Sequence, residues 1–171
     1  MSPTAWKPPP AAKVYEAFSA VADGRVHLGA EVEQGGSAQG GQAGSAEVES
    51  SGRDRRYVVE WSAGVTSITA NDNASYWQGY LGYPAVAVLL AIGALRADRT
   101  IVDLLAGVPW HELNARFKRD YDAAVDSVLS DLERRGADRG RIEREVDDVL
   151  AQLARLSPQR PPRRRRPPSG G

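Results

Sequence analysis

The chain has 171 residues, no cysteine and two histidines, and its 22 basic and 22 acidic side chains balance. This length fits one domain with short appendages. The lack of cysteine excludes disulfides, thiol nucleophiles and cysteine-ligated metals within this sequence. His27 and His111 are too few for a three-histidine metal site, and no nucleotide-binding or hydrolase motif is present. We therefore predict no cofactor, no metal and no catalytic residue, and the sequence argues against an enzyme.

The N-terminal end differs in composition from the middle of the sequence. Four of the first ten residues are proline, and proline does not continue a helix or a central strand. Residues 1–12 are therefore predicted to be a disordered lead. No long apolar run lies in the first twenty residues, which argues against a secretory signal and favours a cytoplasmic protein. Trp6 either docks on the folded part or is exposed, and the sequence does not decide between the two.

Residues 13–107 are predicted to form an α+β domain that begins with a helix. Val14, Phe18 and Val21 follow helical spacing, and Asp23-Gly24 supplies a stop. This pattern predicts an N-terminal helix that ends at Gly24, followed by strands whose one apolar face needs a cover.

A three- to four-stranded antiparallel meander is predicted next. Apolar and polar residues alternate in 25–33, 46–49 and 57–61, and residues 65–70 are rich in β-branched side chains. The glycine-rich segment 34–45 is predicted to be a flexible hairpin loop. Charged side chains on the polar positions of these strands are predicted to be solvated: His27, Glu31, Glu33, Glu47 and Glu49. Arg25 alternates with the apolar residues of the first strand.

A central helix is predicted after the sheet. Pro84 suits a helix start, and residues 85–95 are apolar on nearly every side. A helix of this kind is either buried or spans a membrane. The apolar run is well short of the ~20 residues that cross a bilayer, so we predict a buried helix and no membrane span.

A C-terminal helical hairpin is predicted over residues 108–156. A short helix at 101–106 precedes it. The first long helix is expected to run unbroken from Pro109 to Arg135 with Asp120 on its solvated face, and the second covers 142–156. The second helix carries apolar residues separated alternately by four and three positions: Ile142, Val146, Val149, Leu153 and Leu156. Such a seam predicts a protein partner or a homodimer through the C-terminal helices.

The segment from Asn71 to Pro84 gathers amides, an acid and aromatic rings at a strand-to-helix junction. Ligand sites combine apolar walls with a few polar groups in such places. Tyr76 and Tyr80 would share one face of a helical turn. The candidate ligand-binding residues are Asn71, Asp72, Asn73, Tyr76, Trp77 and Tyr80. The same residues also suit turns, helix caps and core packing, and both interpretations stay open.

Residues 157–171 are predicted to form a disordered tail rich in arginine and proline. Five arginines occur there without an acid: Arg160, Arg163, Arg164, Arg165 and Arg166. The rest of the chain has 17 basic against 22 acidic residues. Such a basic arm can contact nucleic-acid phosphates without base specificity. It can also contact anionic lipid, fold back on the acidic body, or serve only for solubility.

Three functional hypotheses follow for this α+β fold. The first is a small intracellular, non-catalytic protein-interaction module acting through the helical hairpin. The second is a small-molecule-binding domain or enzyme with a site at Asn71–Tyr83. The third is a nucleic-acid-associated protein that uses the arginine-rich arm.

Overall fold

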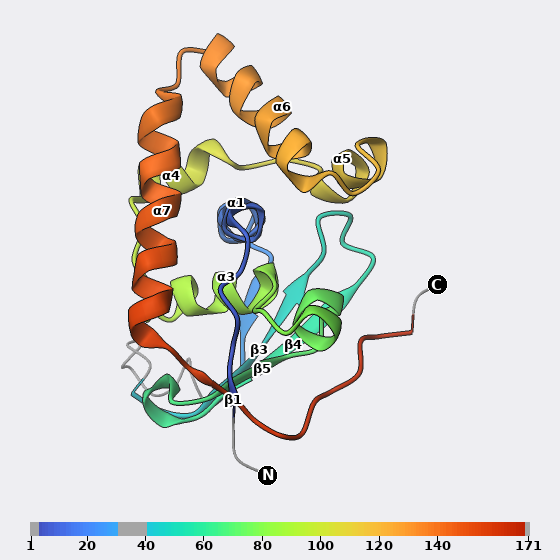
Figure 1. Ribbon diagram of the computed structural model, residues 1–171, viewed down its shortest axis with the longest axis vertical. Helices are drawn as coiled ribbons and strands as arrows, with labels where there is room; N and C mark the ends of the chain where they lie inside the picture. The colour runs from blue at the N-terminus through green and yellow to red at the C-terminus, as the bar shows by residue number, and fades with distance from the viewer. Residues whose placement is uncertain (1–3, 31–40, 170–171) are drawn as a thin grey trace.

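The computed structural model describes residues 4–30 and 41–169, and the architecture is α+β (Figure 1). The main sheet is antiparallel, with strand order β2-β3-β4-β5, which is the predicted meander. Its strands are β2 (Val26–Leu28), β3 (Gly44–Glu49), β4 (Arg56–Trp61) and β5 (Ile68–Ala70). Residues 31–40 lie outside the described residues, and with them the predicted end of the first strand, including Glu31 and Glu33, and most of the predicted loop 34–45.

The sheet buries one face because its register brings apolar residues opposite each other. Val48 lies between Val26 and Tyr57, and Val59 lies between Ala46 and Ala70. Since successive side chains of a strand point to opposite faces, this register gathers the apolar side chains on one side. The buried residues of the strands are Ala46, Val48, Val59, Trp61, Ile68 and Ala70.

The predicted buried central helix is confirmed. Helix α3 (Tyr83–Ala91) packs against all four strands of the sheet on one side and against α1 (Ala11–Ala22) on the other. Its residues 84–89 are all buried, as expected for a helix without a polar face. Within the described residues, no helix combines the length and apolar character that a bilayer crossing requires.

The unbroken helix predicted from Pro109 to Arg135 is wrong. The chain instead forms α5 (Trp110–Arg116) and α6 (Tyr121–Arg134), after a short α4 (Arg99–Leu104). Lys118 and Arg119 adopt positive φ angles of 52° and 65° between them. Asp120 is not on a helix face: it caps α6 by accepting a hydrogen bond from Ala123 N at 3.1 Å, which satisfies a free N–H of the new helix.

Helices α6 and α7 (Arg139–Leu156) form a fork with α1 between them (Figure 1). This arrangement removes the reason for predicting that the apolar seam of the last helix binds a partner. Ile142 and Val149 are fully buried, and Val146 and Leu153 are nearly so, because α7 packs its apolar stripe on α1 of the same chain. The stripe is therefore core.

The two ends of the chain, expected to be disordered, pair with each other in their described parts. Strand β1 (Thr4–Ala5) is antiparallel to β6 (Gln159–Arg160). Trp6 docks: its Nε1 donates to Ile68 O at 3.1 Å. Gln159 N donates to Thr66 O at 2.8 Å. Composition does not indicate which backbone groups pair with distant segments, so the high proline content alone led to a prediction of disorder.

Candidate functional site

The predicted site at 71–83 divides into a buried part and an exposed part. In the buried part, Asn71 Oδ1 accepts a hydrogen bond from Val58 N at 2.7 Å, which ties the chain after β5 to β4. Asp72 Oδ1 accepts from Ser75 Oγ at 2.6 Å and Oδ2 from Ser75 N at 3.2 Å. Ser75 Oγ in turn accepts from Gly82 N at 3.0 Å. These polar groups are engaged within the chain.

Asp72 is a buried carboxyl, only 5% exposed. Burial raises the pKa of Asp72 above its ordinary value near 3.8, although the hydrogen bonds from Ser75 act in the opposite direction. The native state therefore binds the Asp72 proton more tightly than the unfolded chain does.

Replacement of Asp72 by asparagine is expected to change how stability depends on pH. Because the pKa of Asp72 is raised in the native state, Asp72 makes its full contribution to the free energy of unfolding below pH 3.8. This contribution declines as the pH rises through the pKa of the native state. The wild type should therefore lose stability relative to Asp72→Asn as the pH increases above 3.8. Urea unfolding of both proteins across this range measures the difference, and a constant difference or one of opposite slope would contradict the assignment.

The outer part of the predicted site is aromatic: Trp77 is exposed and Tyr76 is half-buried. Tyr76 and Trp77 lie on a five-residue π-helix, Ala74–Gln78, and their rings meet edge to face at 4.6 Å between centroids. Asn73, on the preceding turn, is also exposed. The expected stacking of Tyr76 on Tyr80 is wrong, because Gly79 takes a left-handed φ of 77° and ends the helical turn. Tyr80 instead forms a bridge with Lys7.

The arginine-rich arm runs beside these aromatic rings. Arg164 Nη1 donates to Tyr76 O at 2.9 Å, and its guanidinium carbon lies 5.2 Å from the Tyr76 ring centroid. Arg160 lies 5.5 Å from the Trp6 ring centroid, and Arg165 pairs with Glu60 at 2.8 Å. The two regions that the sequence treats as separate candidates thus meet on one surface.

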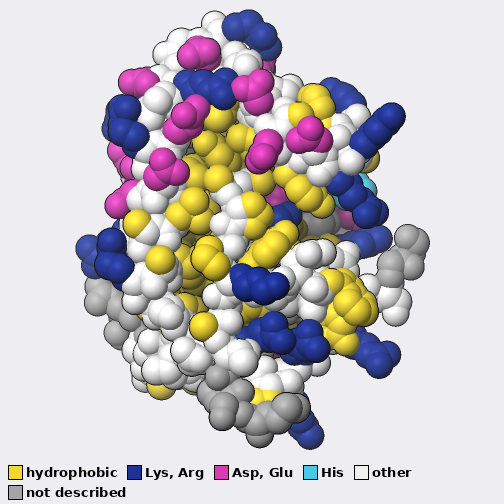
Figure 2. Space-filling view, viewed as in Figure 1, with side chains coloured by type: hydrophobic (Ala, Val, Ile, Leu, Met, Phe, Trp, Pro, Cys, Tyr) yellow, Lys and Arg dark blue, Asp and Glu magenta, His cyan; other side chains and the backbone are white. Residues whose placement is uncertain are grey.

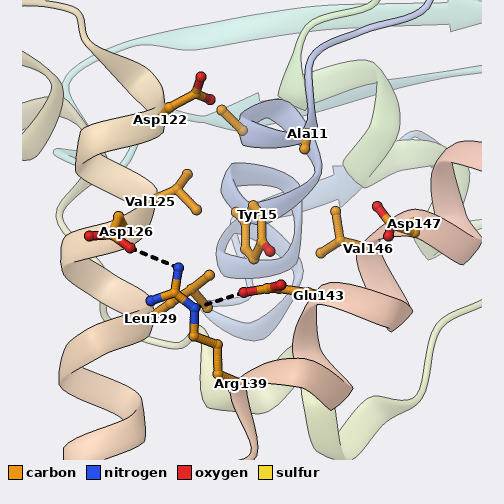
Figure 3. A pocket seen from close by; sticks show the side chains of 11 residues that line it. Ala11, Tyr15, Asp122, Val125, Asp126, Leu129, Arg139, Glu143, Val146 and Asp147 are labelled. Atoms are coloured by element: carbon orange, nitrogen blue, oxygen red, sulfur yellow. Dashed lines mark hydrogen bonds and ion pairs between the residues drawn. The ribbon is translucent and has the colours of Figure 1, made fainter.

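A third feature, which the sequence did not reveal, is a groove where the fork of α6 and α7 meets α1 (Figure 3). It has a volume of about 270 Å³. Its apolar floor consists of Ala11, Ala12, Tyr15, Val125, Leu129 and Val146, and its charged rim consists of Asp122, Asp126, Arg139, Glu143 and Asp147. Of the floor residues, Ala11 and Val125 are partly exposed, whereas Ala12, Tyr15, Leu129 and Val146 are buried. Figure 2 shows apolar side chains in this region with acidic side chains on both sides.

The rim has an excess of negative charge. Arg139 of α7 bonds to Asp126 of α6 and to Glu143 of its own helix, each at 2.7 Å, so its pair with Asp126 links the two helices. Among the described residues, Asp122 and Asp147 have no ion-pair partner. Two carboxylates are therefore available to a cationic ligand.

Tyr15 lies at the centre of the groove (Figure 3). Tyr15 is only 4% exposed. Its hydroxyl has no hydrogen-bond partner among the described residues. Burial, with the charges of Glu143 and Asp147, raises the pKa of Tyr15 to about 12. The phenol is therefore a neutral hydrogen-bond donor at physiological pH.

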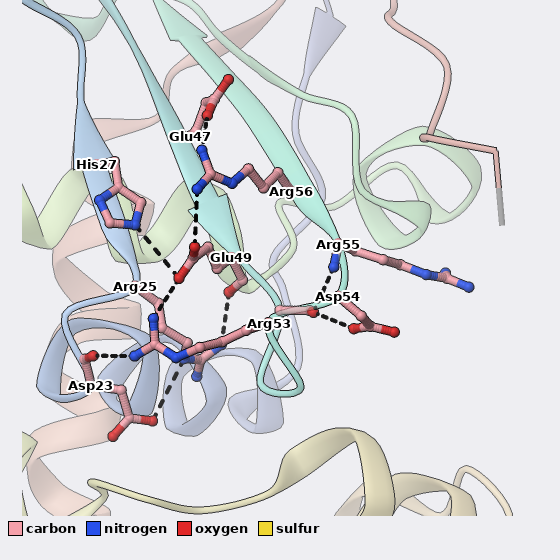
Figure 4. A network of polar contacts seen from close by, with 10 residues as sticks. Asp23, Arg25, His27, Glu47, Glu49, Arg53, Asp54, Arg55 and Arg56 are labelled. Atoms are coloured by element: carbon pink, nitrogen blue, oxygen red, sulfur yellow. Dashed lines mark hydrogen bonds and ion pairs between the residues drawn. The ribbon is translucent and has the colours of Figure 1, made fainter. Parts of the chain in front are cut away.

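A network of charged groups covers the outer face of β2–β4 (Figure 4). Arg25, which alternates with apolar residues in the sequence, is only 2% exposed. Its Nη1 donates to Glu49 O at 2.9 Å, and its Nε lies 3.5 Å from Asp23 Oδ2. Glu49 also departs from the expected solvation, since it contacts His27 and Arg53. Desolvation acts to raise the pKa of Glu49, but His27 and the nearby arginines lower it by more, so this pKa lies below its ordinary value. These mutual contacts give the network a structural role.

The fold places the protein among α+β domains. The chain belongs to the family described as Uncharacterised conserved protein UCP014422, whose family model matches residues 6–159. The matched span includes every residue of the groove and ends before the arginines of the arm. The comparisons with curated proteins and with solved structures found no match.

Proposed function

We propose that this chain is a small cytoplasmic, non-catalytic interaction module that binds a cationic amphipathic segment of a partner protein in the groove between α1, α6 and α7. The observation that carries the proposal is the combination of an apolar floor with the unpaired carboxylates Asp122 and Asp147. The lack of cysteine fits a reducing compartment.

The shape of the groove favours a segment of protein over a small molecule. Small-molecule sites usually enclose most of the ligand and have volumes of ~300–1,000 Å³. This groove, at about 270 Å³, lies at the lower end of that range, and it is open to solvent (Figure 2). Apolar side chains of a segment would pack on Ala11 and Val125, the partly exposed residues of the floor, and its basic side chains would pair with the rim. The Tyr15 hydroxyl can donate to a backbone carbonyl of the bound segment.

The test uses three synthetic amphipathic peptides with the same apolar face and a basic, neutral or acidic polar face. We expect fluorescence anisotropy at low salt to show the basic peptide binding most tightly and the acidic peptide most weakly. Asp122→Asn with Asp147→Asn should weaken binding of the basic peptide roughly 5- to 30-fold, which corresponds to about 1–2 kcal/mol for two partly screened pairs.

A matched control removes two negative charges from the same helices outside the groove. Glu133 and Asp148 are exposed and do not line it, so Glu133→Gln with Asp148→Asn should leave the affinity within about twofold. Equal binding of the three peptides, equal effects of the two double variants, or self-association of the chain that buries the groove would each overturn the proposal.

A further inference from the structure

The surface around Trp77 combines an exposed aromatic ring with the cationic arm. Trp77 is 69% exposed, more than any other large apolar side chain of the described residues. A single exposed apolar residue needs no explanation by itself. Here, however, its neighbour Tyr76 holds Arg164 by a hydrogen bond and by ring contact, so aromatic and cationic groups are interleaved.

The arm is held in place at its start and extended beyond it. The pairing of β6 with β1 fixes Gln159 and Arg160, and the proline pairs on either side of Arg163–Arg166 favour an extended chain. Arg165 is paired with Glu60. Among the described residues, Arg163 and Arg166 have no ion-pair partner and are exposed. Figure 2 shows several basic side chains below the acidic region of this face, and others at its top and edges.

We propose that the arm and the Tyr76–Trp77 pair form a binding site for single-stranded nucleic acid. Arginines that follow the backbone, together with aromatic rings that stack on bases, are the two components of sequence-tolerant single-strand binding. The arm supplies the phosphate contacts, and Trp77 supplies the ring. A duplex hides the faces of its bases within the stack and offers only its phosphates to this surface.

An anionic lipid surface fits the same region less well. Membrane-surface binding uses a helix with a broad apolar face, whereas the five-residue helix here is Ala-Ser-Tyr-Trp-Gln. Apart from Trp77, the only large apolar side chain that is exposed in the described part of the chain is Leu104, which lies on α4. The surface thus has one stacking ring and no apolar face to insert.

The experiment measures binding of the full chain to fluorescent oligo(dT) of about 20 nucleotides, with heparin, a duplex and phosphatidylserine vesicles as comparison ligands. We expect oligo(dT) to bind most tightly. Trp77→Ala should weaken oligo(dT) binding about 5- to 150-fold and leave heparin binding unchanged, because heparin has no bases to stack. Arg163→Ala with Arg166→Ala should reduce the slope of log affinity against log salt by about 1.4 for oligo(dT).

The control for charge is Arg116→Ala with Arg144→Ala, since both residues are exposed and lie on α5 and α7, away from the arm. This variant should leave the slope unchanged. The proposal is overturned by binding to vesicles alone, by equal affinity for heparin and oligo(dT) that Trp77→Ala does not alter, or by no binding of oligo(dT). Because the groove residues are untouched, these outcomes are independent of peptide binding.

Discussion

Phe18→Ala is expected to lower the free energy of unfolding by about 3–5 kcal/mol, the range for removing an aromatic ring from a packed core. Phe18 is fully buried on α1, the helix that contacts α3, α4, α6 and α7. Removal of its ring leaves a cavity in the core, and the helices packed on α1 limit how far the site can collapse. Chemical denaturation monitored by circular dichroism gives the difference.

Trp77→Ala is the control for this prediction, because it also removes an aromatic ring but from an exposed position. Surface substitutions usually change stability by less than about 0.5 kcal/mol, so its denaturation midpoint should stay close to that of the wild type. A loss below about 1 kcal/mol for Phe18→Ala would show that α1 is not the centre of the core. It would also remove the basis for a rigid groove against α1.

The layered architecture was predictable because burial leaves a strong mark on composition. The segment around Val86 and Leu89 has no charged residue, and such a helix has to be covered on all sides. The period of two in β3 and β4 likewise identified strands with one buried face. Both signals come from local sequence and do not depend on which distant segment supplies the cover.

The features that define the two candidate surfaces depend on contacts between distant residues. No glycine or proline marks the break at Lys118 and Arg119, yet this break sets the direction of α6 and therefore opens the groove. Arg139 holds the fork by pairing across two helices. The approach of Arg164 to Tyr76 joins residues 88 positions apart. Periodicity carries no information on such pairs.

Several charged side chains are buried in surroundings that the sequence pattern did not predict. Arg25 lies in an alternating pattern that assigns it to the polar face, but Asp23, the Glu49 carbonyl and the Tyr83 ring surround it. Lys13 and Glu16 are buried on α1 as an ion pair at 3.1 Å, and Glu16 also accepts from Asn114 Nδ2 at 2.8 Å. A long charged side chain can be buried when partners satisfy it, and those partners come from the fold.

Gly82→Ala is expected to destabilise the protein by about 2–3 kcal/mol, the upper part of the range for overpacking. Gly82 has an ordinary negative φ of −73°, so backbone strain is not the reason. A Cβ at this position would overlap Asp72 Oδ2 and lie 2.6 Å from Asp72 Cγ. The carboxyl group would have to leave its site, and the bonds from Ser75 N and Ser75 Oγ would be lost with it. Gly41→Ala, where a Cβ meets no atom within 4 Å, is the matched control and should be nearly neutral.

A double-mutant cycle separates this clash from a general cost of alanine at the helix start. Asp72→Ala alone should cost about 1–3 kcal/mol, because it leaves the buried Ser75 N–H and hydroxyl without their acceptor. In the Asp72→Ala background the obstructing carboxyl is absent, so Gly82→Ala should add little. The two changes should therefore be non-additive by at least about 1 kcal/mol, measured by urea unfolding of the four proteins. Additive effects would mean that Gly82 is required for a reason other than its close approach to Asp72.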